Sequence, residues 1–203
     1  MTDYRIFRSD DAMRFADKHS ELFGDHSKLT ATEFGDGNLN LVFRVANDKG
    51  TSLIVKQALP YARCVGESWP LSTDRARIEA EVLQLHARFC PEHTVEVLHY
   101  DAEQAAILME DLDHLTLLST GLAEGRQFQQ LGTQLAEFIV NAGFANSDFS
   151  LDLAAKKSRQ IQFLNPEPLQ ISEDLLLNDP FSNNERNQID ASLYPLAQHI
   201  WLD

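Results

Sequence analysis

Three turns rich in glycine or acidic residues divide the first half of the chain into short apolar segments, and they constrain the fold more than any other feature. The turns are GDG at 35–37, NDKG at 47–50 and DAEQ at 101–104. Tight turns of this kind join antiparallel neighbours. The segments around them are bounded by turn residues and are predicted to be strands: 29–34, 39–45, 52–56, 95–100 and 105–110. The sequence therefore predicts a five-stranded antiparallel sheet.

Two helices are predicted within this first part. Residues 9–23 open with Ser and Asp, have apolar residues at roughly helical spacing and are followed by Gly24. Residues 73–89 lie between the third and fourth strands. With Thr73 as the expected N-cap, one apolar stripe is formed by Ile78, Val82, Leu85 and Phe89. The second helix is therefore expected to pack on the sheet.

The pattern changes after EDL at 110–112. Only helical periodicity follows, at 126–144, 152–164 and 184–202, with Pro195 as an expected kink. We predict an α+β fold, with an N-terminal lobe at 1–112 and a helical C-terminal lobe at 113–203. Because the pattern stops at HIWLD without a glycine or asparagine cap, the helical lobe is expected to be truncated, with residues missing beyond Asp203.

Composition excludes several classes of function. The formal charge is -14, from 31 acidic and 17 basic residues, and no basic cluster occurs, so no nucleic acid partner is expected. There is neither a run of about 18 apolar residues nor a basic-then-apolar N-terminus, so we expect no membrane partner and a cytoplasmic protein. Cys64 and Cys90 are expected to be ordinary buried or half-buried thiols, and no metal site is predicted.

Four weak signals for nucleotide binding occur in a defined order. Gly35 and Gly37 would let a turn approach phosphates closely, although a plain hairpin explains the same residues. Lys56 ends an apolar strand, where it either reaches solvent or meets a carboxylate or phosphate. Glu79 on the following helix is a candidate counter-charge, and Glu81 competes with it. Such a Lys–Glu pair holds a lysine against the phosphates of ATP.

The fourth signal is LMEDL at 108–112, where the last strand meets the helical half. Main-chain groups at such a crossover can bind a flat heterocycle, and Met109 can pack on its ring; an acidic linker is the plainer interpretation. The order of the four signals is that of the small lobe of the protein-kinase-like fold. A Walker loop is absent because no GK[ST] occurs, and GDGN does not continue as GxGxxG.

Longer blocks of the sequence resemble S-methyl-5-thioribose kinase, a relative of aminoglycoside and choline kinases. The blocks are GDGNLNLVF, IVKQALPYARCVGESWPLSTDRARIE at 54–79, MEDL, NPE at 165–167 and NDPF at 178–181. The resemblance covers nearly the whole chain, as the N-terminal half or so of such an enzyme. It implies ATP- and Mg²⁺-dependent phosphorylation of the 1-hydroxyl of 5-methylthioribose, giving the 1-phosphate in methionine salvage, by an enzyme that is a homodimer.

The resemblance also implies roles for particular residues. Asn40, Lys56 and the Glu110, Asp111, Leu112 hinge would contact ATP. The segment GESWPL at 66–71 would be a loop near the cleft mouth, in which Glu67, Ser68 and Trp69 face the substrate; a tryptophan packed onto the sheet is the alternative.

Two motifs of this family are missing. No HGDLH catalytic loop and no DPE metal segment occurs, and DPF at 179–181 is not a substitute because it precedes the expected loop. Phosphoryl transfer needs both. We therefore predict that the chain is the nucleotide-binding part of the kinase, inactive alone. A choline- or aminoglycoside-type kinase and a non-catalytic nucleotide-binding or partner-binding module remain the alternatives.

Overall fold

The computed structural model describes residues 4–24, 28–34, 37, 39–64, 66–178, 180, 190–193 and 195–196. The chain falls into two compact units, Met1–Phe163 and Leu164–Asp203. The larger unit holds the sheet and most helices. The predicted lobe boundary after residue 112 therefore lies inside the larger unit and stays a prediction.

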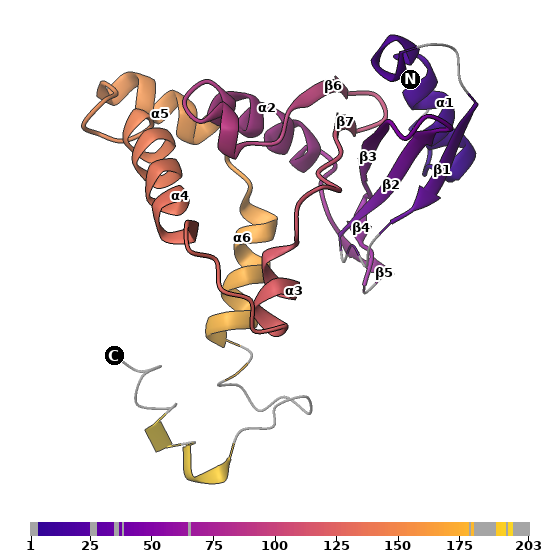
Figure 1. Cartoon of the computed structure of the whole chain (residues 1–203). Coiled ribbons are helices and arrows are strands. Elements are labelled where there is room, and N and C mark those ends of the chain that lie inside the picture. The colour runs from indigo at the N-terminus through magenta and orange to yellow at the C-terminus, as the bar shows by residue number, and fades with distance from the viewer. Residues whose placement is uncertain are drawn as a thin grey trace. The chain divides into compact units, whose positions relative to one another are not determined.

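The larger unit is built on a five-stranded sheet (Figure 1). Its strands are β1 (Leu29–Glu33), β2 (Asn40–Asn47), β3 (Ser52–Ala58), β6 (Val97–Asp101) and β7 (Ala106–Glu110). They follow the order β1-β2-β3-β7-β6, and every neighbouring pair is antiparallel. The predicted α+β class and five-stranded antiparallel sheet are confirmed. The predicted strand bounds agree with the observed ones to within about two residues.

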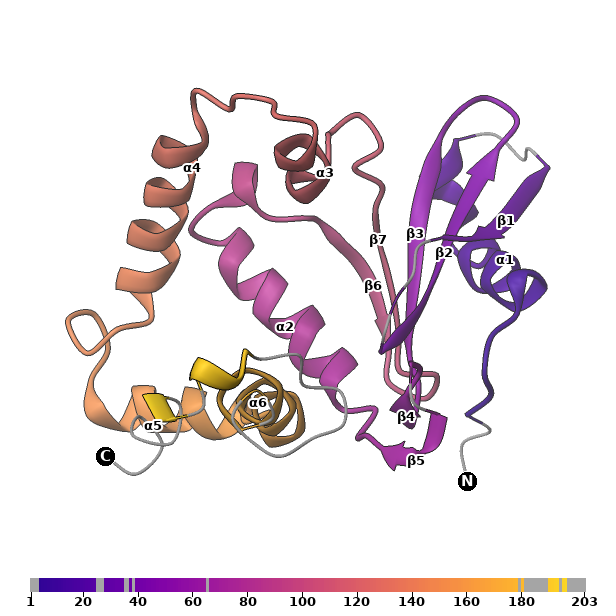
Figure 2. The ribbon, with the colours of Figure 1, turned by 90° about the horizontal axis from the view of Figure 1, so that it is seen from below.

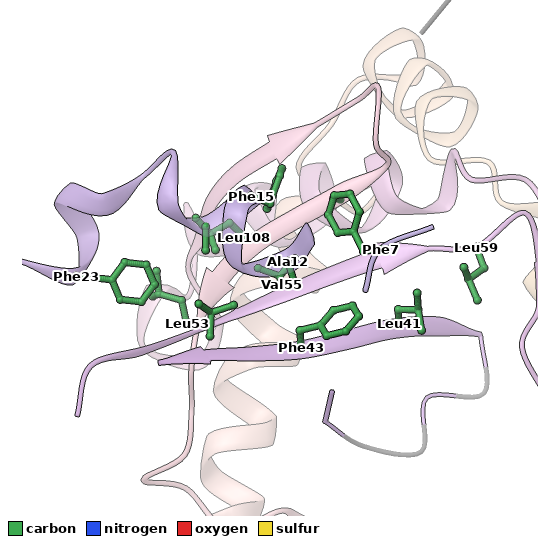
Figure 3. Close-up of a cluster of buried hydrophobic side chains, with 13 residues drawn as sticks. Phe7, Ala12, Phe15, Phe23, Leu41, Phe43, Leu53, Val55, Leu59 and Leu108 are labelled. Carbon is green, nitrogen blue, oxygen red and sulfur yellow. The ribbon is translucent and has the colours of Figure 1, made fainter. Parts of the chain in front are cut away.

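One face of the sheet carries the main hydrophobic core. Side chains alternate along β2, so Leu41, Phe43 and Val45 are buried on this face. Leu53, Val55 and Leu108 join them from the neighbouring strands (Figure 3). Helix α1 (Ser9–Asp17) covers the cluster with Ala12 and Phe15. The first helix was thus predicted too long: it ends at Asp17, and a separate 3-10 turn follows at Ser20–Phe23 before Gly24, whose φ is 80°.

The opposite face is covered at one end by α2 (Arg75–Ala87), so α1 and α2 lie on opposite sides of the sheet (Figure 2). Small residues make the contact, because Ala76 and Ala80 pack against Ile107 and Met109. The predicted packing of this helix on the sheet is confirmed, and α1 covers the other face in addition. The predicted stripe was wrong in part: Ile78 is buried, but Phe89 is 38% exposed. Asp74, not Thr73, is the N-cap residue.

A second, two-stranded sheet follows β3. It consists of β4 (Tyr61–Ala62) and β5 (Gly66–Pro70), which pair antiparallel. The expectation that residues 66–71 form a loop was therefore wrong for 66–70. The main chain of this segment hydrogen-bonds to β4, and Leu71 N–H donates to the Pro60 carbonyl at 3.0 Å. These bonds hold the segment in an extended conformation.

Helices make up the remainder of the larger unit. They are α3 (Leu118–Ala123), α4 (Leu131–Phe138), a π-helical turn at Ile139–Gly143 and α5 (Leu153–Gln162). The predicted helix at 126–144 therefore begins later, and α3 was not predicted. Cys90 is buried and its Sγ lies 4.0 Å from the Glu137 and Phe138 carbonyls, whereas Cys64 is exposed, contrary to expectation.

The smaller unit begins with α6 (Pro166–Glu173), in which Asn165 is the N-cap residue and Pro166 the first residue. A π-helical turn at Asp174–Asn178 and a 3-10 turn at Ala191–Leu193 follow. Most of the predicted helix at 184–202 lies outside the described residues. Across the described ranges of both units, no helix has the length and apolar character needed to cross a membrane.

Candidate functional site

Lys56 and Glu79 form an ion pair on the α2 side of the sheet. The Lys56 ammonium donates to Glu79 Oε1 at 2.5 Å, and both side chains are partly exposed. Lys56 comes from the centre of β3, where Val42 is its partner on β2 and Ile107 its partner on β7. A lysine at such a position needs a carboxylate or another anion. The pair therefore fixes a cation over the middle of the sheet.

Glu81, the competing candidate, has other partners. Its Oε2 lies 3.0 Å from Arg77 Nη1 and accepts from Gln162 Nε2 at 2.8 Å. Arg77 also bonds Asp74, and this hydrogen bond holds the pKa of the Asp74 carboxyl below its ordinary value. The two glutamates, two positions apart on α2, are thus directed to different neighbours. Glu79 alone of the two meets the sheet lysine.

Asn40 begins β2 on the same face as Val42 and Lys56, because side chains alternate along strands. Its Oδ1 accepts from Arg75 Nε at 3.1 Å and from Arg75 Nη2 at 3.0 Å. Arg75 was not singled out from the sequence; the only signal was its position one helical turn before Glu79. The structure thus joins Asn40 and Lys56, two of the residues expected to contact ATP, to α2.

Gly37 lies just before this strand. A Cβ atom at Gly37 would come within 2.5 Å of the Asn40 carbonyl oxygen, far closer than side-chain atoms approach backbone. A glycine is therefore required at this close approach. Gly35, the other predicted turn residue, lies outside the described residues.

An apolar surface lies between two polar groups on this face. Val42 and Ile54 are partly exposed, and Met109, opposite Ile54, is 8% exposed. The Lys56–Glu79 pair lies towards one end of the face. Towards the other end, Arg44 donates to Asp111 Oδ1 at 3.0 Å. An apolar surface next to a fixed cation is suited to a flat heterocycle that carries a charged group.

Two of the three hinge residues, Glu110 and Asp111, use their side-chain carboxylates within the fold. Glu110 accepts a hydrogen bond from the Glu96 N–H at 2.7 Å. Asp111, whose side chain is 4% exposed, accepts from Ser52 Oγ at 2.8 Å in addition to Arg44. Leu112 is exposed, and its carbonyl accepts from Leu115 N–H at 2.9 Å. Because both carboxylates are engaged, a ligand at this edge would meet main-chain groups.

The three residues predicted to face a second substrate all lie on β5. Glu67 and Ser68 are exposed, and Trp69 is half-buried.

Within the described residues, no group of three His, Cys, Asp or Glu side chains could hold a metal ion. Asp190 accepts from the Ser192 hydroxyl at 2.7 Å, which holds the pKa of its carboxyl below the ordinary value.

Comparison with known proteins identifies clear relatives. No family model matches the chain. The methylthioribose kinase of Pectobacterium atrosepticum is 49% identical over 201 residues, which are 98% of this chain and 50% of that protein. Those of Pectobacterium carotovorum (48% over 201 residues; 98% and 50%) and Yersinia enterocolitica (47% over 196 residues; 96% and 49%) are similar. The chain is thus a homologue of these proteins, and it spans about half the length of the curated relatives it matches.

Among solved structures, the chain is similar to a crystal structure from Thermobifida fusca provisionally assigned as a fructosamine-3-kinase. The two share 22% identity with a TM-score of 0.41, over 66% of this chain and 39% of the other.

Proposed function

We propose that this chain is the nucleotide-binding part of a methylthioribose kinase, within a protein-kinase-like small lobe. The complete reaction would be the ATP-dependent phosphorylation of the 1-hydroxyl of 5-methylthioribose. The names of the relatives support the substrate. The observation that carries nucleotide binding is the 2.5 Å ion pair between Lys56 and Glu79, on the sheet face that also presents Asn40.

Each part of the site has a place in this proposal. Lys56, held by Glu79, would bind the α- and β-phosphates of ATP. The turn at Gly35 and Gly37 would cover the phosphates, with Asn40 beside them. Val42, Ile54 and Met109 would contact the base, and the main chain at 110–112 would hydrogen-bond its edge. When bound, ATP supplies the γ-phosphoryl group.

The sugar is assigned to β5 of this chain, and the metal to a protein of the relatives' length. Trp69, with Glu67 and Ser68 on β5, would cover the sugar and help exclude water. Because the HGDLH and DPE motifs of the family do not occur in this sequence, we assign the Mg²⁺ ligands and the catalytic carboxylate to a protein of the relatives' length. Loss of such a general base costs about 10²–10⁴-fold in rate. The 203-residue chain is therefore proposed to bind ATP without turning it over.

Lys56→Met tests nucleotide binding directly. In the 203-residue chain, titration calorimetry should show about 10–100-fold weaker ATP binding, the loss expected for one charge-assisted contact. Lys28→Met, at an exposed position before β1, is the matched control and should bind as the original chain does. Undiminished ATP binding by Lys56→Met would overturn the assignment.

The substrate is tested by activity. Phosphorylation of 5-methylthioribose is measured side by side on this chain and on a protein of the relatives' length, with Mg²⁺ and with choline and an aminoglycoside as competing acceptors. We expect activity only in the longer protein and only with 5-methylthioribose. Turnover by the short chain would show that the catalytic group lies within it. The homodimer and the cytoplasmic location are proposed on family resemblance, and sedimentation of the longer protein tests the dimer.

A further inference from the structure

Arg75 connects the start of α2 to the start of β2 through its whole guanidinium group. Besides its two bonds to Asn40 Oδ1, it donates from Nη2 to the Leu39 carbonyl at 2.9 Å and from Nη1 to the Ser72 carbonyl at 2.7 Å. Only 6% of the residue is exposed. A buried arginine with this many fixed partners holds the segments that it joins in one geometry.

These bonds determine how the Asn40 amide is oriented. An arginine has only hydrogen-bond donors, so the Asn40 atom that faces it must be the amide oxygen. If the amide were reversed, the NH₂ group of Asn40 would point at the N–H groups of Arg75, and donor would face donor. With Oδ1 turned to Arg75, Asn40 Nδ2 is directed elsewhere, and its two N–H groups are donors. A phosphate oxygen is only an acceptor, so this orientation suits a phosphate and opposes a donor ligand.

The same helix face also holds Lys56. Arg75 and Glu79 are four residues apart on α2 and therefore lie next to each other on its surface. Arg75 bonds Asn40 on β2, and Glu79 bonds Lys56 on β3. One turn of α2 thus contacts both side chains that are proposed to bind phosphates.

We propose that Arg75 is a positioning residue for nucleotide binding, which fixes the amide of Asn40 so that Nδ2 donates to a phosphate oxygen. The inference rests on the proposed function, since it presupposes a nucleotide at this face. In this proposal Asn40 is specifically a hydrogen-bond donor to the phosphate, and not a general polar contact. Arg75 itself acts through Asn40 and does not touch the ligand.

A double-mutant cycle separates this role from a structural one. ATP affinity of the 203-residue chain is measured for Arg75→Met, Asn40→Ala and the double variant. If Arg75 acts through Asn40, Arg75→Met weakens binding about tenfold alone but less than about twofold in the Asn40→Ala background. Equal losses in both backgrounds would mean that Arg75 only stabilises the helix, and would overturn the proposal.

The matched control is Arg77→Met on the same helix. Arg77 pairs with Asp74 and Glu81, and among the described residues it makes no hydrogen bond to β2, so Arg77→Met removes an arginine of the same helix and should leave ATP affinity unchanged. A loss with Arg77→Met as large as with Arg75→Met would also overturn the proposal. Thermal unfolding of each variant shows that it is folded. If Arg75→Met does not fold, Arg75→Lys, which keeps the charge but not the planar fork, replaces it.

Asn40→Asp tests the donor without altering Arg75. The carboxylate still accepts from Arg75 but offers no donor and adds a negative charge, so ATP should bind more weakly than to Asn40→Ala. Binding to Asn40→Asp as tight as to Asn40→Ala or tighter would overturn the proposal. If Lys56→Met weakens binding as expected while these comparisons fail, only the role of Arg75 is lost; if the original chain does not bind ATP, both proposals fall.

Discussion

At the residue scale, some side chains of this site were identified from the sequence, and others were recognised only from their contacts in the structure. Lys56 was found because a lysine in an apolar strand needs a partner, and the structure supplies Glu79. Arg75 was not found, and neither was Gln57, a buried residue outside the site. Gln57 is fully buried although its sequence context, LIVKQ, does not mark it as different from a strand-end polar residue.

Gln57 fastens the N-terminal segment to the sheet. Its Oε1 accepts from the Phe7 N–H at 2.8 Å, and its Nε2 donates to the carbonyls of Arg5 at 2.8 Å and Gln104 at 3.0 Å. Gln57→Met keeps the size of the side chain but removes these partners. Leaving a buried polar group without a partner costs about 1–3 kcal/mol, so we expect a loss of at least this size in the free energy of unfolding.

Urea unfolding measures this loss. Gln84→Met, at an exposed position of α2, is the matched control and should change the midpoint little. A Gln57→Met chain as stable as the original would show that water or a small movement of residues 5–7 replaces the lost bonds.

At the element scale, turns and alternation predicted the strands well, whereas helix faces and the second sheet were predicted poorly. Strand positions follow from local turn chemistry. The buried face of α2 does not, because the close approach of the helix to the sheet favours Ala76 and Ala80 over larger residues. Segment 66–70 became β5 because β4 lies close enough to pair with it, and no local signal encodes that partner.

The contact between α1 and β6 predicts a pH dependence. His99 on β6 lies against His19, with ring centroids 4.3 Å apart, and against Phe15 of α1 at 6.0 Å. Burial, together with the neighbouring His19 and Lys18, lowers the pKa of His99 below its ordinary value of 6.5, against the opposing effect of Asp101. Below about pH 6.5, His99 is therefore protonated more readily in the unfolded chain than in the folded chain.

The free energy of unfolding should thus decrease as the pH falls below 6.5, and be fully retained above it. His99→Gln should make this decrease shallower. Part of the decrease in the free energy of unfolding should remain, because burial also lowers the pKa of His86. Denaturant unfolding at several pH values measures the slope, with His114→Gln at an exposed position as the control. An unchanged slope in His99→Gln would contradict the assignment.

At the scale of the whole molecule, the helices of residues 113–163 leave large apolar side chains exposed. Ile139, Val140 and Ile161 are each more than 60% exposed, and Phe149 is 88% exposed. Soluble monomers rarely leave extensive apolar patches uncovered. Since the chain spans about half of its relatives, we expect this surface to be covered in a protein of their length.

An apolar dye tests this expectation. The 203-residue chain should bind 8-anilinonaphthalene-1-sulfonate, and the pair Leu135→Glu and Ile161→Glu should reduce its fluorescence without lowering stability, because both side chains are exposed. The matched pair Gln134→Glu and Ser158→Glu adds the same charge to the same helices and should change the fluorescence much less. Fluorescence as strong in a protein of the relatives' length would show that the surface stays uncovered there.

The sequence by itself determined the antiparallel sheet, the order of its strands along the chain and the candidates Lys56 and Glu79, because turn residues and a lysine in an apolar strand act locally; Asn40 was indicated by the family resemblance. Only the tertiary structure decided that Glu79 and not Glu81 meets Lys56, that Arg75 holds Asn40, and that Asp111 is bound within the fold. These choices depend on which segments distant in sequence come within hydrogen-bonding distance. Packing of the sheet against α1 and α2 sets those distances, and no local pattern records them.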